Sequence, residues 1–233
     1  MKRFYKTAQA VETDSGWAVA LDGRTVKTPA RADLALEERA LADALAAEWN
    51  AQGETVDVAG MHLTRLVNVA IDRTPQERDG MIDEVARYCE TDLLCFLAGE
   101  DQAELRTRQV SAWRPIREWA GRAMGVVLME APAGTLHQPQ PPASLDAARD
   151  HVRALDDLKL TAFLFGMGIY GSALLMLAVE QGETSSVEAY DLSILDEVWQ
   201  AEKWGQDDEA EARHAARRAE IRVLEKIFQP PTG

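Results

Sequence analysis

The sequence is poor in the residues that build disulfide frameworks and metal centres. Among its 233 residues there are two cysteines and four histidines. Cys89 and Cys95 stand six residues apart in a pattern that predicts one helix, so they would face different sides of it and could not form a disulfide there. No paired-cysteine zinc spacing occurs, and the histidines are scattered; His137 in a proline-rich loop and His214 on a charged helix are expected to be exposed. We therefore expect reduced cysteines, as in a cytoplasm, and no bound metal.

The motifs of nucleotide binding and covalent catalysis are also absent. The sequence has no phosphate-binding loop, no dinucleotide fingerprint and no nucleophile elbow. Acidic residues are plentiful, but only Asp92, Asp196 and Glu202 are predicted to lie against apolar surface. Because a pair of carboxylates can perform acid–base chemistry, a carboxylate-based hydrolase or a small-molecule binding protein remains an alternative function. The sequence alone brings no two of these acids together in space.

Positive charge is scarce. The chain has 39 acidic residues against 25 lysines and arginines, which gives a net charge of −14. Such a balance disfavours nucleic acids and anionic membranes as partners and suits a protein that meets a basic or mixed-charge protein surface. The first residues, MKRFYKTAQ, have neither an apolar core nor a cleavage site, so we expect no signal peptide.

Only one stretch is apolar for long enough to raise the question of a membrane span. Residues 160–179 contain no charged side chain, and about 20 apolar residues suffice to cross a bilayer as a helix. Gly166, Gly168 and Gly171 interrupt this run, however, and its charged start looks continuous with a helix from about Leu145. We interpret it as a central helix that is buried on all sides within a helical domain, and we expect no stable membrane insertion.

The N-terminal residues predict a small β-rich domain. Asp22-Gly23 is a strong two-residue hairpin turn, and the resulting register places Leu21 opposite Arg24. The same register pairs the residues further from the turn as follows: Val19 with Val26, and Trp17 with Thr28. One helix is expected over residues 37–52, with Leu41, Leu45 and Trp49 on its buried stripe and Gly53 as its stop.

After residue 60 the pattern becomes helical. The predicted helices cover residues 61–71, 76–96, 104–124 and 208–228, in addition to the apolar run, and a proline-rich loop is expected over 132–142. The fold class is therefore α+β, with a β-rich N-terminal domain over residues 1–60 and a larger, all-helical C-terminal domain over 61–233. Asp92 is the odd residue of the second helix, because an acid there precedes Leu93, Leu94 and Cys95. We expect it to form a buried salt bridge with an arginine such as Arg87 or Arg108.

The most informative stretch runs from Asp196 to Ala210, DEVWQAEKWGQDDEA. Helical spacing places Leu192, Leu195, Trp199 and Glu202 on one face, so that Glu202 extends an apolar stripe. A carboxylate there is costly unless a donor pairs with it, and an internal arginine or backbone N–H would satisfy it. Gly205 is expected to end this helix, and Asp207 to cap the next one.

This stretch resembles the closing motif of the F(1)-ATPase assembly chaperones, a family that attends the α subunit of ATP synthase. The family pattern is close to DExxQxExWGxDxEA, and its fixed positions match from Asp196 to Ala210. Further blocks match in order along the chain: VALDGRTVKTPA (19–30), AAEWNAQ (46–52), MHLTRLVNVAID (61–72), YCETDLLC (88–95) and Gly171-Ser172. Departures from the family pattern occur at Glu37, Arg114 and Phe96-Leu97.

The resemblance implies a non-enzymatic chaperone in the bacterial cytoplasm. It would bind the free α subunit transiently, mask its interface and prevent aggregation until the β subunit displaces it, with no cofactor, nucleic acid or small-molecule substrate. Glu202 is the first candidate for a partner contact, supported by Trp204 and Asp207 and followed by Asp196 and Gln200, whereas Trp199 is expected in the core. An open groove with an apolar floor beside the last two helices would favour this function. An enclosed polar pocket with two facing acids would favour the hydrolase.

Overall fold

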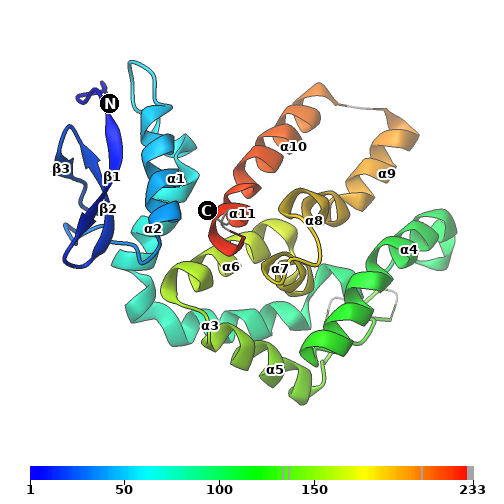
Figure 1. Cartoon of the computed structure of the whole chain (residues 1–233). Coiled ribbons are helices and arrows are strands. Elements are labelled where there is room, and N and C mark those ends of the chain that lie inside the picture. The colour runs from blue at the N-terminus through cyan, green and yellow to red at the C-terminus, as the bar shows by residue number, and fades with distance from the viewer. Residues whose placement is uncertain (133, 136, 206, 230–233) are drawn as a thin grey trace.

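The computed structural model describes residues 1–132, 134–135, 137–205 and 207–229, and it has the predicted α+β organisation (Figure 1). A small sheet comes first and helices follow. The strands are β1 (Ala8–Thr13), β2 (Gly16–Leu21) and β3 (Arg24–Thr25). The helices are α1 (Arg39–Asn50), α2 (His62–Asp72), α3 (Thr74–Glu90), α4 (Ala103–Trp119), α5 (Pro142–Arg153), α6 (Asp157–Tyr170), α7 (Ala173–Glu180), α8 (Ser186–Ser193), α9 (Leu195–Trp204), α10 (Asp208–Ile221) and α11 (Val223–Phe228). Short 3-10 turns lie at Val58–Gly60, Leu93–Cys95 and Glu100–Gln102, and a π-helical turn at Ala120–Met124 extends α4.

The sheet is antiparallel in the order β1-β2-β3, and its turn is the one that Asp22-Gly23 predicts. Both turn residues have positive φ, 48° for Asp22 and 84° for Gly23, as a tight hairpin requires. The predicted pairing of Leu21 with Arg24 is confirmed. The predicted pairing of Trp17 with Thr28 is wrong, because β3 is only two residues long and Trp17 instead exchanges backbone hydrogen bonds with Leu36.

Helix α1 packs on this sheet through its predicted stripe. Leu41, Leu45 and Trp49 are all buried, and the ring of Trp49 meets Tyr5 edge-on at 5.6 Å between centroids. The hydroxyl of Tyr5 donates to the backbone carbonyl of Trp49 at 2.7 Å, so the start of the chain is tied to the end of α1. The helix ends at Asn50, two residues before the predicted end at Gln52.

Three predicted long helices are each broken in the structure. The predicted helix over 76–96 ends at Glu90, the apolar run 160–179 is split between α6 and α7, and the final helix is interrupted at Arg222. The split of the apolar run has a clear local cause. Gly171 adopts a left-handed conformation with φ of 63°, and the side chain of Ser172 then caps α7 by accepting from the backbone N–H of Leu175. Among the described residues, no helix is long and apolar enough to cross a membrane.

Asp92 lies at the junction between the end of α3 and the start of α7, and it is completely buried. The predicted salt bridge is wrong: neither Arg87 nor Arg108 reaches it, and both pair elsewhere. Its carboxylate instead accepts hydrogen bonds from the backbone N–H groups of Leu94 (3.0 Å) and Leu174 (3.0 Å) and from the hydroxyl of Ser172 (2.8 Å). Burial raises the pKa of Asp92 to about 6, although these hydrogen bonds act in the opposite direction.

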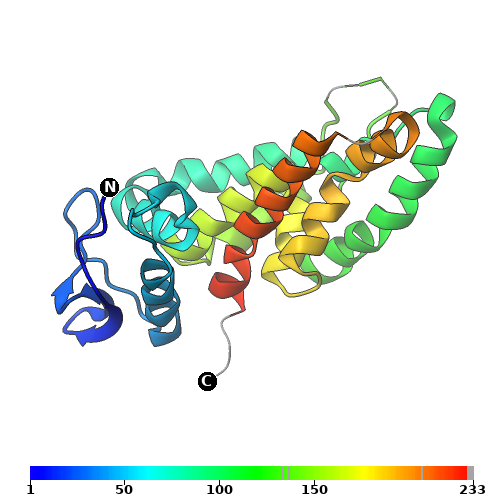
Figure 2. The same cartoon turned by 90° about the horizontal axis from the view of Figure 1, so that it is seen from above.

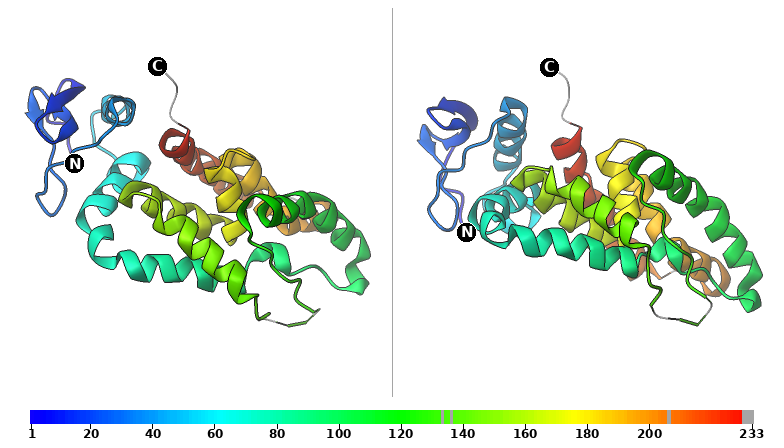
Figure 3. Two further views of the ribbon diagram at one scale, coloured as in Figure 1. Left: turned by 60° about the horizontal axis from the view of Figure 1, so that its bottom comes forward. Right: turned by 90° about the horizontal axis from the view of Figure 1, so that it is seen from below.

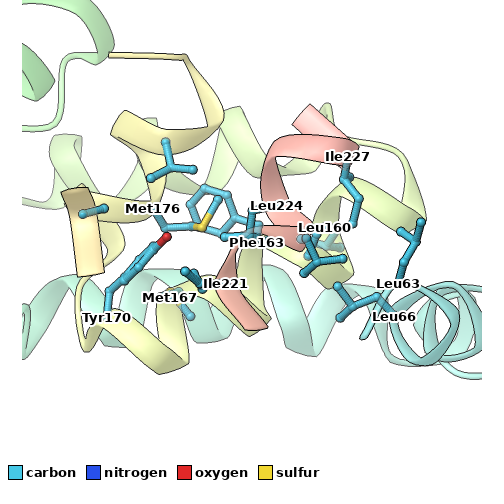
Figure 4. Packing of buried hydrophobic residues seen from close by; sticks show 14 of the residues in the cluster. Leu63, Leu66, Leu160, Phe163, Met167, Tyr170, Met176, Ile221, Leu224 and Ile227 are labelled. Atoms are coloured by element: carbon cyan, nitrogen blue, oxygen red, sulfur yellow. The ribbon is translucent and has the colours of Figure 1, made fainter. Parts of the chain in front are cut away.

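The core is formed where helices from distant parts of the chain meet (Figure 4). Leu63 and Leu66 of α2 face Leu160 and Phe163 of α6, and the last two helices contribute Ile221, Leu224 and Ile227. Gly166 lets α6 pack closely against α7 and α11. A Cβ atom at this position would lie 2.3 Å from the sulfur of Met176 and 2.8 Å from Leu224. Ile221 and Leu224 therefore form the inner side of the two C-terminal helices, and Phe228 packs against the same core while partly exposed.

The molecule is elongated, with the sheet at one end and α4 at the other (Figures 1 and 2). Seen from the other side, α3, α5 and α6 run side by side between these two ends (Figure 3). Helix α9 packs against α4, and α10 runs back from α9 to the middle of the molecule, where its Glu220 lies 3.5 Å from His62 of α2. The predicted motif from Asp196 onward is thus brought to the end of the molecule that lies furthest from the sheet.

Candidate protein-binding groove

Helix α9 carries most of the predicted site and is bounded by the predicted signals. It ends at Trp204, and Gly205 follows with φ of 104°, a conformation that side chains with a Cβ rarely adopt. Asp207 then caps α10 by accepting from the backbone N–H of Glu209 at 3.0 Å. Both predictions are confirmed. The start of α9 was not predicted, because a turn at Ile194 separates it from Leu192 in α8.

A network of four charged side chains joins α9 to α4. Glu202 forms an ion pair with Arg108, with 2.7 Å between Oε2 and Nη1, and Lys203 donates to Glu104 at 2.7 Å. Arg108 also lies 4.0 Å from Glu104. The hydrogen bond from Lys203 lowers the pKa of the Glu104 carboxyl below its usual value. The predicted need of Glu202 for a donor is therefore met by an arginine, although its side chain is 48% exposed rather than buried. Arg108 is 43% exposed, so both members of the pair remain accessible to a partner.

Next to this pair lies an open groove, which we call the α4–α9 groove. Its volume is about 680 Å³. Ala112, Leu195 and Val198 supply its apolar side chains, and the large side chain of Val198 is exposed. The remaining lining residues are polar or charged: Thr107, Arg108, Ser111, Asp191 and Arg218. Arg218 donates to Asp191 at 2.7 Å, so each of the two arginines of the groove is held by an acid.

Asp196 has a different environment from Glu202. Its carboxylate accepts from the amide of Gln109 at 2.7 Å, and the amide oxygen of that buried glutamine accepts from the backbone N–H of Ala98 at 2.7 Å. One turn further along α4, the indole of Trp113 donates to the backbone carbonyl of Leu192 at 3.0 Å. These contacts fix α9 and the end of α8 on α4, so Asp196 positions the helix that carries Glu202.

None of the five predicted site residues lines the groove itself; Glu202 stands next to it through its pair with Arg108, and Trp204, Gln200 and Asp207 lie away from that pair. Successive residues of a helix are rotated by about 100°, so Trp204 points to nearly the opposite side of α9 from Glu202. Trp204 is 75% exposed and its ring meets the buried Trp199 edge-on at 5.9 Å. Gln200 is exposed on α9, and Asp207 is occupied as a helix cap. The core position predicted for Trp199 is confirmed.

Three of the four histidines, His62, His151 and His214, contact an acid or a tyrosine, and His137 is exposed as predicted. His62 lies 3.5 Å from Glu220, and His151 shares a hydrogen bond of 2.8 Å with Glu180. The prediction that His214 is exposed is wrong: its side chain is only 15% exposed, and its Nδ1 shares a hydrogen bond of 2.9 Å with the hydroxyl of Tyr190. In the described ranges, no group of three potential metal ligands comes together.

Sequence reasoning missed the residues of α4 and α8–α10 that complete the groove. Arg108 was considered only as a partner of Asp92, and Val198, Asp191 and Arg218 were not singled out. The spacing from Leu195 to Val198 and Glu202, three and then four residues, is the one sequence signal that places these side chains on a common helix face. The contribution of α4 depends on packing between segments about ninety residues apart and left no local signal.

Comparison with known proteins gives consistent matches. A family described as ATP12 chaperone protein matches residues 2–121. The mitochondrial protein atp12 of Schizosaccharomyces pombe is 25% identical over 219 residues, which cover 90% of this chain and 75% of that protein. The crystal structure of Atp12 from Paracoccus denitrificans is similar with a TM-score of 0.89 and 36% identity, covering 99% of this chain and 98% of that one. The Atu1473 protein of Agrobacterium tumefaciens has a TM-score of 0.89 and 37% identity, covering 97% of this chain and 86% of that one.

Proposed function

The chain belongs to the ATP12 chaperone family, and on that premise we propose that it is an assembly chaperone of the F-type ATP synthase in the bacterial cytoplasm. It binds the free α subunit transiently and masks the surface through which that subunit later contacts the β subunit. Exposed subunit interfaces promote aggregation, so a stoichiometric binder that covers one raises the yield of assembly. The β subunit releases the chaperone by competing for the same surface, and no nucleotide or cofactor is required.

The observation that supports a binding site for the α subunit is the α4–α9 groove. Its apolar floor can take up an apolar side chain of the partner, and the exposed Val198 would then become buried. The half-exposed pair of Arg108 and Glu202 stands at its edge, where charge-assisted hydrogen bonds to the partner can fix the orientation. Open shape and surrounding ion pairs are features of a protein-binding surface.

The same features argue against the carboxylate-based hydrolase. The acid that lines the α4–α9 groove, Asp191, is paired with Arg218, and Glu202 at its edge is paired with Arg108. General acid catalysis needs a carboxyl that is held protonated or is poised to transfer a proton, and an arginine partner opposes this by favouring the charged form. Among the described residues that line this groove Asp191 is the one acid, so no second lining acid faces it.

Within the predicted site we assign different roles to the five residues. Glu202 is the first candidate contact with the α subunit, and Asp196 acts indirectly by fixing α9 on α4 through Gln109. Trp204 and Gln200 form a second exposed face of α9 that can extend the interface past the groove. Asp207 contributes by capping the start of α10.

The test is capture of purified α subunit by the protein in the absence of nucleotide, followed by light scattering and size-exclusion chromatography. The wild-type protein should form a stoichiometric complex, suppress aggregation and release the α subunit when β subunit is added. Glu202→Gln should keep its fold and weaken capture by about fivefold, the loss of roughly 1 kcal/mol from one charge-assisted contact.

Glu77→Gln on α3 is the matched control. Glu77 forms an exposed pair with Arg73 at 2.8 Å and is 52% exposed, which resembles the Glu202 pair in both distance and exposure. It should bind the α subunit like the wild-type protein. Equal weakening of capture by Glu202→Gln and Glu77→Gln would show that Glu202 has no specific role in binding. Absence of any complex with the α subunit would overturn the proposed function.

A further inference from the structure

Helix α4 and the turn that follows it are basic in a chain that is otherwise acidic. Between residues 103 and 124 the sequence has five arginines and two glutamates, whereas the whole chain has a net charge of −14. Two of these arginines are neutralised by other elements. Arg108 pairs with Glu202 of α9, and Arg117 pairs with Glu130 at 2.5 Å while it donates to the carbonyl of Leu128.

The other three arginines keep most of their charge available. Arg106 donates to the backbone carbonyl of Ala98, which satisfies a donor without neutralising the guanidinium. The guanidinium of Arg122 lies 3.9 Å from Glu118, but the two side chains are 74% and 57% exposed, so water screens their attraction. Arg114 is exposed and has no ion pair with any residue that the structure describes.

These three residues line one groove. It has a volume of about 630 Å³ and also contains Val110, Pro115, Glu118 and Glu183, so arginines outnumber acids there. A neighbouring groove of about 510 Å³ shares Arg114, Glu118 and Arg122 and adds the exposed side chain of Val127. We call the surface formed by Arg106, Arg114 and Arg122 with the apolar Val110, Pro115 and Val127 the arginine face.

We propose that the arginine face binds an acidic, amphipathic segment of the client protein. The inference rests on the proposed function in one respect, namely that the segment belongs to the captured subunit. Thr107 and Ser111 line both the α4–α9 groove and the groove beside the three arginines, so the two surfaces are continuous across α4. A client protein bound in the α4–α9 groove can therefore also contact the groove beside the three arginines.

The spacing of the arginines defines the segment more closely. They follow one another at intervals of eight residues, and at about 1.5 Å per residue this places successive arginines about 12 Å apart along the axis of α4 and the π-helical turn that extends it. A client helix with acids about two turns apart matches that interval. Apolar residues between its acids would meet Val110, Pro115 and Val127.

A polypeptide fits this surface better than a nucleic acid. Phosphate backbones carry closely spaced charges, and the acids Glu118 and Glu183 inside the groove would repel them. The net charge of −14 repels a long polyanion at a distance as well. Carboxylates placed two helical turns apart can instead contact the arginines individually and leave the acids of the groove free.

The experiment measures binding of a labelled synthetic peptide by fluorescence anisotropy at low salt and at 0.3 M NaCl, a condition in which surface charges are strongly screened. The probe is a 20-residue amphipathic helix with leucines on one face and glutamates on the other, and a second peptide has lysine at every glutamate position. The wild-type protein should bind the acidic peptide but not the basic one, and added salt should weaken the binding. Arg114→Glu should weaken it by about tenfold, because one attraction becomes a repulsion.

Two further variants keep the test decisive. Arg87→Glu on α3 changes the net charge equally at a side chain that is 67% exposed, and it should bind the acidic peptide like the wild-type protein. Arg114→Gln removes the charge without adding an acid and should give an intermediate loss if Arg114→Glu does not fold.

Failure of the wild-type protein to bind the acidic peptide, or equal weakening by Arg114→Glu and Arg87→Glu, would overturn the inference. Equal binding of a single-stranded DNA 20-mer would also overturn it, because the surface would then attract polyanions in general. If the α subunit is captured and the peptide is not, the arginine face is wrong and the proposed function stands. If the peptide binds in an Arg114-dependent way and the α subunit is not captured, the chemistry of the arginine face stands and the proposed client is wrong.

Discussion

Two regions of the molecule contain an acid that interrupts an apolar sequence pattern: the buried junction of α3 with α7 and the edge of the α4–α9 groove. At the junction, Asp92 is fully buried and accepts three hydrogen bonds, two of them from backbone N–H groups. At the groove, Glu202 is 48% exposed and has a single arginine as its partner. Asp92 thus accepts from backbone N–H groups at the starts of helical segments, where the helix itself offers no acceptor. The charge of Glu202 remains accessible.

The difference teaches how to separate a structural acid from a functional one. A carboxylate surrounded by fixed N–H groups has no capacity left for a partner, and its removal exposes those donors to an apolar interior. A half-exposed ion pair contributes little to folding and can exchange its partner at low cost. Asp92 should therefore control stability, and Glu202 should control binding.

The largest expected effect comes from Asp92→Ala. The change leaves two backbone N–H groups and the Ser172 hydroxyl without an acceptor inside the protein, and it should lower the free energy of unfolding by about 4 kcal/mol. Urea denaturation followed by circular dichroism measures this. Asp92→Asn keeps one acceptor oxygen and should lose less, and a loss below about 1 kcal/mol in the alanine variant would show that water replaces the carboxylate.

The second effect is a dependence of the free energy of unfolding on pH, caused by the titration of Asp92. Its pKa is raised by burial from 3.8 to about 6, so between these values the folded state binds the proton that the unfolded state has released. Stability from this group is fully present below pH 3.8 and is lost as pH rises through about 6, by at most about 3 kcal/mol.

Carboxyls with lowered pKa values act in the opposite direction, so the measurement must compare two proteins. Glu188 is one such group, since the backbone N–H of Ser185 lowers its pKa. The free energy of unfolding of the wild-type protein minus that of Asp92→Asn, measured from pH 3.5 to pH 7, should fall as pH rises. A difference that stays constant across this range would show that Asp92 titrates normally.

The third effect belongs to the groove. Val198→Asp places a carboxylate on the apolar floor and should weaken α-subunit capture by about thirtyfold, or roughly 2 kcal/mol, because the charge is desolvated in the complex. Its thermal midpoint should change little, since Val198 is already 41% exposed. Val58→Asp, at an exposed valine outside the groove, is the control and should capture the α subunit normally. Equal loss of capture in both variants would show that the α4–α9 groove does not bind the α subunit.

The smallest expected effect is on the stability of a variant at Glu202. Glu202→Gln should lower the free energy of unfolding by less than about 0.5 kcal/mol, as expected for an exposed ion pair. Differential scanning calorimetry of this variant beside the wild-type protein measures it. A loss of several kcal/mol would make Glu202 a structural residue like Asp92 and remove it from the binding surface.

The sequence predicted those features that depend on neighbouring residues. The Asp22-Gly23 turn, the end of α9 at Gly205 and the cap at Asp207 all follow from local backbone preferences. The break at Gly171 was missed because the apolar run on both sides of it favours one continuous buried helix. Its cause lies partly outside the run, since Asp92 accepts from Leu174 across more than eighty residues.

The partners of the two acids could not be predicted for the same reason. Periodicity indicated correctly that Asp92 and Glu202 need donors, but the donors come from α7 in one case and from α4 in the other. Arg108 was assigned to the wrong acid, because sequence spacing does not say which segments pack together. The division of the chain at residue 60, and the contribution of Trp204, Gln200 and Asp207 to binding, stay predictions.

Photo-crosslinking from the groove tests the central claim most directly. A photo-reactive amino acid is incorporated in place of Val198, the protein is mixed with free α subunit and illuminated, and the products are separated by electrophoresis; the same amino acid in place of Val58 is the reference. If the α4–α9 groove binds the α subunit, a covalent product with the α subunit forms from position 198, disappears when β subunit is added, and does not form from position 58. A product from position 58 alone, or from neither position while capture persists, would show that the α subunit binds elsewhere on the molecule.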